Sequence, residues 1–335
     1  MLIGLTFDRR SDYLAAGFGD EETAEFDRDD TIDIIETTLR ELGHETDRIG
    51  HVHALTKRIA RGDRWDLVFN IAEGLEGAAR EAQVPALLDA YQIACTFSDP
   101  LVSALTLHKA LTKRVLRDLG LATAPFFVAE TVDDLDAVDL PFPLFVKPLA
   151  EGTAKGIDGR SMVPGPAKLA AVVRRVVDEF RQPALIETFL PGREFTVGIT
   201  GTGDDAVAVG TLEVVLLDVA EPHSYTYVNK ERCEELCQFP LAPPEWTEPA
   251  ETLALEAWRG LGCRDAGRVD LRADGTGRLH VLEINPLPGL HPSHSDLPMI
   301  CTAVDMPYIE LIRRIVDSAA KRVRPVDLRL ARLTA

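Results

Sequence analysis

The segment 267–289, GRVDLRADGTGRLHVLEINPLPG, carries acidic side chains in a pattern suited to metal binding. Asp270 lies on one predicted strand, and Glu283 and Asn285 lie two residues apart on the next, so the latter two share one sheet face. An Asp-Gly pair between the strands predicts a hairpin that brings Asp270 to the same place. Two carboxylates and an amide oxygen are hard ligands suited to Mg²⁺ beside phosphate. Solvent-facing acids are the alternative, which the apolar run LHVLEIN disfavours.

Basic and glycine-rich segments indicate a phosphate-binding site. Lys147 ends the apolar strand PLFVKP, and a lysine there implies an anionic partner. The glycines of the next segment, 151–156 (EGTAKG), would let backbone amides approach a phosphate. Lys109 and Lys113 lie one helical turn apart, a spacing that on its own is more typical of a solvated helix face. Arg268 lies two residues before Asp270 and so shares its sheet face.

The composition limits the classes of protein to which the chain can belong. Its 335 residues carry 36 Lys and Arg against 54 Asp and Glu, a net charge of −18 that disfavours a nucleic-acid partner. No apolar run is long enough to span a membrane, and the start of the chain reads as a strand. Five cysteines in a large chain disfavour a disulfide framework. We therefore expect a folded cytoplasmic protein, with Cys233 and Cys237 as helix neighbours and no metal pair between them.

Strand and helix signals predict an α/β (α+β) fold in three parts. Strands alternate with helices over 1–97, which predicts a parallel sheet. A helix over 101–119 and a strand-helix segment follow, and the pattern becomes strand-rich after residue 184. We expect an N-terminal domain, a small central domain, a C-terminal domain holding the metal and substrate site, and a solvated basic tail. The expected bounds are 1–97, 98–185, 186–320 and 321–335.

Three smaller expectations complete the prediction of structure. His280 alternates with apolar strand residues and is expected at the surface. The polar segment 222–240 is a candidate lid over the site. A closing helix is expected over 308–320.

The order of these segments resembles one family. HKALTK, FVKP, EGTAKG, ETFLPGREF and LEINPLPGLHPSHSDLP follow one another as in the ATP-grasp ligases, specifically the D-alanine–D-alanine ligase branch, over about residues 1–320. The resemblance implies an ATP-grasp fold, in which an N-terminal parallel-sheet domain precedes two domains that clamp ATP. It also implies two Mg²⁺ ions (Mn²⁺ as an alternative), small amino acid or carboxylate substrates and a homodimer.

The resemblance also implies roles for single residues. The resemblance implies that ATP is bound by Lys109, Lys147, Gly152, Gly156, Glu187, Phe189, Leu190 and Glu194. The two metal ions fall on Asp270, Glu283 and Asn285. Catalytic roles fall on Arg268, the Gly289 amide, Lys230 and Thr153. The second substrate would place its carboxylate at Ser295. The implied reaction activates a carboxylate as an acylphosphate, which an amine then attacks, with release of ADP and phosphate.

The first-substrate region departs from the family. Either Glu25 or Asp27 could replace the glutamate that orients the substrate amine in the family. Glu73 stands in place of the histidine of a His-Gly motif, and Glu231 in place of the lid tyrosine. Asp296 stands where the family has an apolar residue. One hypothesis is a divergent D-alanine–D-alanine ligase, and another is a first substrate with an extra amine or guanidine.

Two other classes of function compete with a ligase. A catalytically silent ATP-binding protein, serving regulation, would not require Arg268, so the presence of this arginine favours an enzyme. A dehydrogenase would need Gly-x-Gly-x-x-Gly after the first strand, and the nearest approach, at Gly17, lies beyond it. A ligase for another amino acid or carboxylate pair, in a specialised pathway, stays open.

Overall fold

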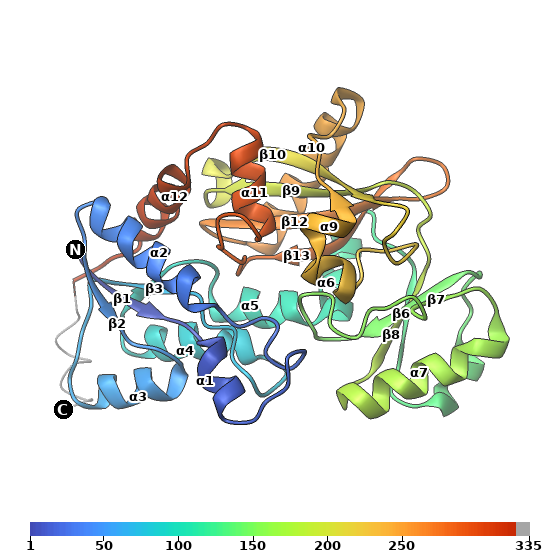
Figure 1. Cartoon of the computed structure of the whole chain (residues 1–335), viewed down its shortest axis with the longest axis horizontal. Helices are drawn as coiled ribbons and strands as arrows, with labels where there is room; N and C mark the ends of the chain where they lie inside the picture. The colour runs from blue at the N-terminus through green and yellow to red at the C-terminus, as the bar shows by residue number, and fades with distance from the viewer. Residues whose placement is uncertain (326–335) are drawn as a thin grey trace.

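The N-terminal sheet is parallel, as the alternation of strands and helices predicts, with strand order β2-β1-β3-β4. The computed structural model describes residues 1–325 of the chain (Figure 1). The strands of this sheet are β1 (Leu2–Thr6), β2 (Glu45–Arg48), β3 (Leu67–Asn70) and β4 (Ala94–Cys95). The helices around it are α1 (Arg10–Ala15), α2 (Asp29–Glu41), α3 (Val52–Ala60), the short η1 (Arg80–Ala82) and α4 (Gln83–Ala90).

Helices from both ends of the chain cover this sheet. On one face, α2 and the closing helix α12 (Tyr308–Ala320) share a hydrophobic core with β1 and β3. On the other face, α3 and α4 pack around Trp65 and Val68. Figure 1 shows α12 beside α2, far in sequence but adjacent in space. The N-terminal core is therefore completed by residues near the C-terminus.

The expectation of a solvated basic tail is wrong at its start. Arg322 pairs with the fully buried Asp265 at 2.6 Å and donates to the Cys95 carbonyl at 2.8 Å. A buried carboxylate needs a cationic partner, and Arg322 supplies it. The rest of the predicted tail, from residue 326, lies outside the described residues.

The second sheet is antiparallel, with order β5-β8-β6-β7. Its strands are β5 (Phe126–Ala129), β6 (Leu144–Pro148), β7 (Met162–Val163) and β8 (Ala184–Thr188). The helices near it are α6 (Lys109–Asp118), η2 (Val132–Ala137) and α7 (Pro166–Phe180), whereas α5 (Pro100–Leu107) packs mainly against η1 and α6. The single helix expected over 101–119 is wrong, since it breaks at His108, whose Nδ1 accepts the Leu111 amide and caps α6.

The third sheet has order β11-β10-β9-β12-β13 and is antiparallel throughout. Its strands are β9 (Glu194–Thr200), β10 (Val207–Leu216), β11 (Cys237–Gln238), β12 (Ala266–Ala273) and β13 (Leu279–Asn285). The accompanying helices are η3 (Gly203–Asp205), α8 (Tyr227–Glu231), α9 (Cys233–Leu236), α10 (Pro244–Leu261) and α11 (Asp296–Ala303). The hairpin β12-β13 is confirmed and pairs Asp270 with Glu283.

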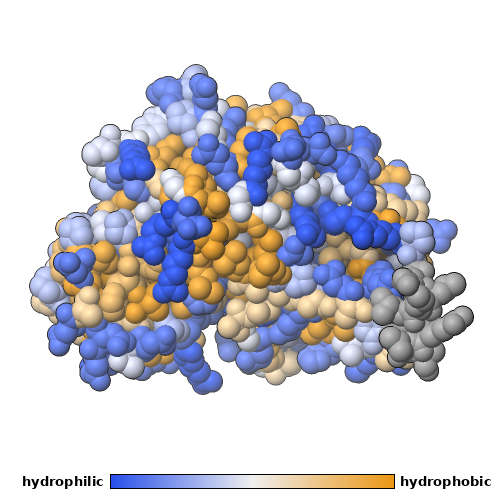
Figure 2. Space-filling view, turned by 180° about the vertical axis from the view of Figure 1, so that it is seen from behind, coloured by the Kyte–Doolittle hydropathy of each residue, from blue (hydrophilic) through white to orange (hydrophobic). Residues whose placement is uncertain are grey.

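His280 is buried, so the expectation of a surface position is wrong. Its Nε2 lies 3.0 Å from Asp274 Oδ2 in the hairpin turn, which draws the ring back against the protein. The rear face of the molecule mixes broad apolar areas with hydrophilic residues, which lie both between these areas and along the edges (Figure 2). Within residues 1–325, no helix combines the length and the apolar character that crossing a membrane requires.

Candidate active site

The residues singled out from the sequence line two adjoining cavities. The Lys147 cavity, of about 110 Å³, lies against β6, β8, β9, β12 and β13. The Glu73 cavity, of about 160 Å³, lies between the N-terminal sheet and the C-terminal substrate loop. Both are lined by Thr153, Lys230, Arg268, Glu283 and Asp296. The two cavities therefore meet at a charged junction.

A buried carboxylate between two lysines lies on one side of the Lys147 cavity. Glu187 contacts Lys113 at 2.5 Å and Lys147 at 2.7 Å, and all three side chains are buried. Burial alone would raise the pKa of Glu187, but the two lysines outweigh it and bring the pKa to about 2. Lys113 also donates to Thr123 at 2.6 Å. Lys113 is thus structural, and the solvated helix face expected for it and Lys109 is wrong.

Lys109 contacts Glu283, one of the predicted metal ligands. Its ammonium lies 2.6 Å from Glu283 and donates to the Glu151 carbonyl. It is 5% exposed, so its charge is held inside the protein at the base of the glycine-rich loop. Lys109 and Lys147 therefore bring two cations to the cavity, as an anionic ligand would require.

Aromatic and apolar groups lie opposite these cations. Phe189 stacks on Phe145 with ring centroids 6.4 Å apart, and the Arg272 guanidinium lies 5.1 Å from the Phe189 ring. Arg272 also pairs with Glu194 at 3.0 Å. Leu190 lines the same wall. The cavity thus offers an apolar, aromatic end and a cationic end.

The predicted metal ligands converge at the junction. Asp270 and Glu283 are register partners on β12 and β13, and the Asn285 amide donates to Asp270 at 3.2 Å. Asp270 Oδ1 is buried and has no hydrogen-bond partner among the described residues. A buried, unpartnered carboxylate oxygen beside two further oxygen donors fits a hard divalent cation. The residues present therefore fit Mg²⁺.

The glycine-rich loop 151–157 is fastened to the N-terminal part by Glu25. Glu25 accepts the Gly152 amide at 2.6 Å and pairs with Arg80 and Lys155, each at 3.1 Å. Burial alone would raise the pKa of Glu25, but these two cations bring the pKa to about 2. A Cβ at Gly152 would lie 2.3 Å from the Glu25 carboxylate, so a larger residue there would push this side chain out of its ion pairs. Glu25, a candidate for orienting substrate, is therefore fully engaged in holding this loop.

The same loop needs a second glycine for a different reason. Gly156 has φ +74°, and a Cβ there would lie 2.5 Å from Pro148. Its amide donates to Glu21 at 3.2 Å. Thr153 lines both cavities from the same loop.

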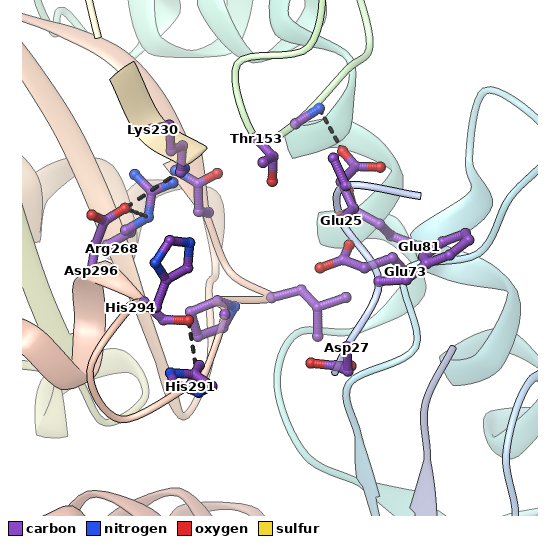
Figure 3. A pocket seen from close by; sticks show the side chains of 18 of the residues that line it. Glu25, Asp27, Glu73, Glu81, Thr153, Lys230, Arg268, His291, His294 and Asp296 are labelled. Atoms are coloured by element: carbon purple, nitrogen blue, oxygen red, sulfur yellow. Dashed lines mark hydrogen bonds and ion pairs between the residues drawn. The ribbon is translucent and has the colours of Figure 1, made fainter. Parts of the chain in front are cut away.

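Arg268 and Asp296 form the centre of the junction. Arg268 pairs with Asp270 and lies 3.2 Å from Asp296, which also lies 3.7 Å from Lys230 (Figure 3). Burial would raise the pKa of Asp296, but Arg268 and Lys230 hold it below its usual value. Asp296 is the first residue of α11 and is buried. Its burial is tolerated because it neutralises two cations, Arg268 and Lys230.

The Glu73 cavity is bordered by carboxylates on one side and the substrate loop on the other. Figure 3 shows Asp27, Glu73 and Glu81 on the side opposite Arg268 and His294. Glu231 of α8 also lines this cavity. On the substrate loop, the Ser295 hydroxyl accepts the His291 amide at 3.0 Å, which leaves its O–H free to donate. A Cβ at Gly289 would lie 2.7 Å from that hydroxyl, so glycine keeps this loop tight.

The candidate lid contacts both sides of the site. Cys233, Leu236 and Cys237 form a small apolar cluster in this segment. Cys237 begins β11, so the expectation that the two cysteines are helix neighbours is wrong. Cys233 also lies 3.9 Å from His294, and the potential metal-ligand atoms of Cys233, Glu234 and His294 lie within 4.8 Å of one another. The Tyr227 amide donates to the Ile157 carbonyl at 3.1 Å, next to the glycine-rich loop. Glu234 lies 3.0 Å from His294 of the substrate loop.

Sequence reasoning missed several residues of the site. Arg80 and Glu81 carried no local signal, because each acquires its role only through a tertiary contact or the cavity. Lys113 carried a helical spacing that indicated a solvated face and gave no sign of its buried ion pair with Glu187. One hint was available: Arg80 and Glu81 directly precede an apolar helix, and charged side chains next to a buried helix tend to be buried with it. Lys155 stood in a segment already named, without a role of its own.

Comparison with known proteins agrees with this arrangement. The family described as D-ala D-ala ligase C-terminus matches residues 115–317. An uncharacterized protein, y4sG, of Sinorhizobium fredii is 32% identical over 306 residues, 87% of either chain. D-alanine–D-alanine ligases of Cupriavidus necator and Bordetella petrii are 32% and 34% identical and are covered to 78% and 77%, as is this chain.

The fold agrees as well. A crystal structure of the D-alanine–D-alanine ligase of Bacillus anthracis complexed with ATP superposes with a TM-score of 0.73. It covers 96% of this chain and 98% of its own, at 21% identity. The predicted α/β architecture is therefore confirmed, and the chain belongs to the D-alanine–D-alanine ligase family of ATP-grasp proteins.

Proposed function

We propose that this protein is an ATP- and Mg²⁺-dependent ligase that joins a carboxylate to an amine and forms a dipeptide or related amide. The observation that carries the proposal is the junction of the two cavities at Arg268, Lys230 and Thr153. A phosphate donor in one cavity and a carboxylate in the other would meet at this point. Family membership and the D-alanine–D-alanine ligases among its relatives support the same reaction.

ATP would bind in the Lys147 cavity. Its base would lie toward Phe189, Leu190 and Glu187, with the ribose near Glu194. Lys109, Lys147 and the amides of the glycine-rich loop would bind the phosphates. Asp270, Glu283 and Asn285 would hold Mg²⁺, which supplies charge neutralisation at the phosphates when bound.

The first step forms an acylphosphate. A substrate carboxylate oxygen bonds to the γ-phosphorus while the bond to the β–γ bridging oxygen breaks, and ADP leaves. Lys230 and Arg268 are placed to offset charge on the transferred group. The lid helices would exclude water, which would otherwise hydrolyse the acylphosphate.

The second step forms the amide. The amine of the second substrate attacks the acyl carbon, phosphate leaves, and the nitrogen loses a proton. The Arg268 guanidinium and the Gly289 amide are donors for the tetrahedral oxyanion. The Ser295 hydroxyl would bind the carboxylate of the second substrate.

The proposal is tested by phosphate release from ATP and Mg²⁺ with single and paired amino acids, D-alanine and L-alanine included, with product masses measured. Arg268→Ala should lower kcat by about 10²-fold or more, as loss of an oxyanion donor does. ATP affinity, measured by calorimetry, should change little. Arg278→Ala is the control, because Arg278 is exposed on the same hairpin. ATP binding without turnover on any pair would favour the catalytically silent alternative.

A further inference from the structure

The Glu73 cavity holds more unpaired negative charge than an alanine-type substrate would neutralise. Asp27, Glu73 and Glu81 line it, and among the described residues none of these side chains makes a hydrogen bond or an ion pair. They come from three segments: the residues before α2, the loop after β3, and η1. Glu231 of α8 is a fourth carboxylate on this cavity.

The cations around the cavity are engaged elsewhere. Arg268 and Lys230 lie against Asp296, and Arg10 lies against Asp20. The two histidines are paired too: His291 lies 3.4 Å from Asp30, and His294 lies 3.0 Å from Glu234. The remaining cation, Arg28, is solvent-exposed. Two buried cations also act on these carboxylates from nearby, Arg80 on Glu73 and both Arg80 and Lys109 on Glu81. Arg80 is paired with Glu25 and Lys109 with Glu283, so among the described residues no cation directly contacts Asp27, Glu73 or Glu81.

A neighbouring acid provides a contrast within the same structure. Glu25 also lines this cavity, but Arg80 and Lys155 pair with it, each at 3.1 Å. At Glu25, which holds the glycine-rich loop, the fold thus places two cations beside the carboxylate. The missing cations at Asp27, Glu73 and Glu81 point to a ligand, since the cavity opens onto the junction where the carboxylate of the acyl donor would react.

The electrostatics of the empty cavity support the same conclusion. Burial, and then the charge of Glu81, hold the pKa of Glu73 well above its usual value. Burial, and then the charge of Glu25, raise the pKa of Glu81 to about 8. Burial and Asp8 raise the pKa of Asp27. The cavity as it stands disfavours these negative charges, and a cation would reverse that.

We propose that the acyl donor is an amino acid with a second cationic group, an amine or a guanidine, which Glu73 and Glu81 bind. Its α-ammonium binds Asp27, and its carboxylate lies at the junction beside Arg268. This inference rests on the proposed ligase function and names its substrate class.

The test compares donors that differ only in the second cation. Ornithine is compared with norvaline, and 2,4-diaminobutyrate with 2-aminobutyrate, each as both enantiomers, with D-alanine as a reference. ADP formation gives kcat/KM, and mass spectrometry identifies the product. A charged hydrogen-bonded partner should raise kcat/KM of the diamino acid at least about tenfold over its neutral counterpart.

Variants then assign the effect to residues. Glu73→Gln and Glu81→Gln should each reduce the diamino preference, the ratio of kcat/KM for the diamino acid to that for its neutral counterpart, to about threefold or less. Glu76→Gln, an exposed position on the same loop, should leave the preference unchanged. Thermal melts of each variant show that it is folded.

The outcomes separate the inference from the function on which it rests. Turnover with D-alanine or 2-aminobutyrate, and no advantage for diamino acids, overturns this inference and leaves the ligase standing. A diamino preference that survives in both variants also overturns it. No turnover with any amino acid, with ATP bound, overturns the ligase function itself.

Discussion

The fold disfavours the ionised form of Glu81, and the pKa of this carboxyl lies in a pH range that experiments can reach. Its pKa rises from 4.5 to about 8, first through burial and then through Glu25. Between these values the folded protein binds a proton that the unfolded chain does not. The free energy of unfolding therefore falls as pH rises from about 4.5 to about 8.

Removing this charge should therefore stabilise the protein mainly at high pH. We expect Glu81→Gln to raise Tm by about 2–4 °C or more at pH near 9, because each kcal/mol corresponds to such a shift. At pH near 5 the gain should be much smaller, because Glu81 is already protonated. Circular dichroism melts measure both, with Glu76→Gln as the exposed control. An equal gain at both pH values would contradict the assignment.

For single residues, the sequence predicted the site roles of strand residues better than those of residues whose role depends on a tertiary contact. Asp270, Glu283 and Asn285 were predictable because two strands and a turn bring them together. Lys113 looked like surface because only the fold reveals Glu187 beside it. Asp27 and Glu25 could not be told apart from the sequence, because both line the cavity and only the fold shows that Glu25 is paired with Arg80 and Lys155.

At the scale of elements, ion pairs hold the glycine-rich loop 151–157 against the N-terminal part of the chain. Glu25, Arg80, Lys155 and Glu151 form a buried set of ion pairs, with Lys155 and Glu151 2.7 Å apart. Arg80 also donates to the Ala150 carbonyl at 2.9 Å. These contacts join the loop to the N-terminal part and should limit its opening.

Breaking this set should loosen the loop. Glu25→Gln removes one charged partner from Arg80 and one from Lys155. Amide exchange over residues 151–157 should therefore become about tenfold faster or more, which corresponds to a loss of about 1.4 kcal/mol in the free energy of opening the loop. Hydrogen-exchange mass spectrometry of the full chain measures it. Glu22→Gln is the matched control, since Glu22 is exposed and accepts only the Gly19 amide. Unchanged exchange in the loop would show that the backbone alone holds it.

Elements with a clear hydrophobic period were predictable, and polar or interrupted ones were not. Strand β2 reads ETDR and has no apolar residue, so nothing in its composition indicates a strand. It forms because β1 offers an edge to pair with. The break at His108 was likewise invisible, since apolar residues continue through it and only the capping contact ends α5.

At the scale of the whole molecule, α12 belongs to the N-terminal core. Leu311, Ile312, Ile315 and Val316 are buried in the same cluster as Ile3, Leu5 and Phe69. Arg322 adds an ion pair to Asp265 just beyond the helix. The sequence predicted the helix itself but gave no sign of its position, because an amphipathic pattern does not name the surface it covers.

A cavity in α12 should therefore weaken the N-terminal sheet. Leu311→Ala removes a fully buried side chain and should cost about 2–5 kcal/mol. Amide exchange in β1 and β3 should rise more than in β6 and β8 of the second sheet. Asp317→Ala, on the exposed side of the same helix, is the control. Equal changes in both sheets would mean that the molecule unfolds as one unit.

The position of α12 has a consequence for how the protein is made. During synthesis the strands of the N-terminal sheet leave the ribosome first, with α3 and α4 soon available to cover one face. The other face, which α2 covers in part, waits for residues 308–320, which follow the strands of all three sheets. Apolar side chains of β1 and β3 thus stay open to chaperones until α12 has emerged, and the N-terminal sheet is covered on both faces only after the other two sheets have been synthesised.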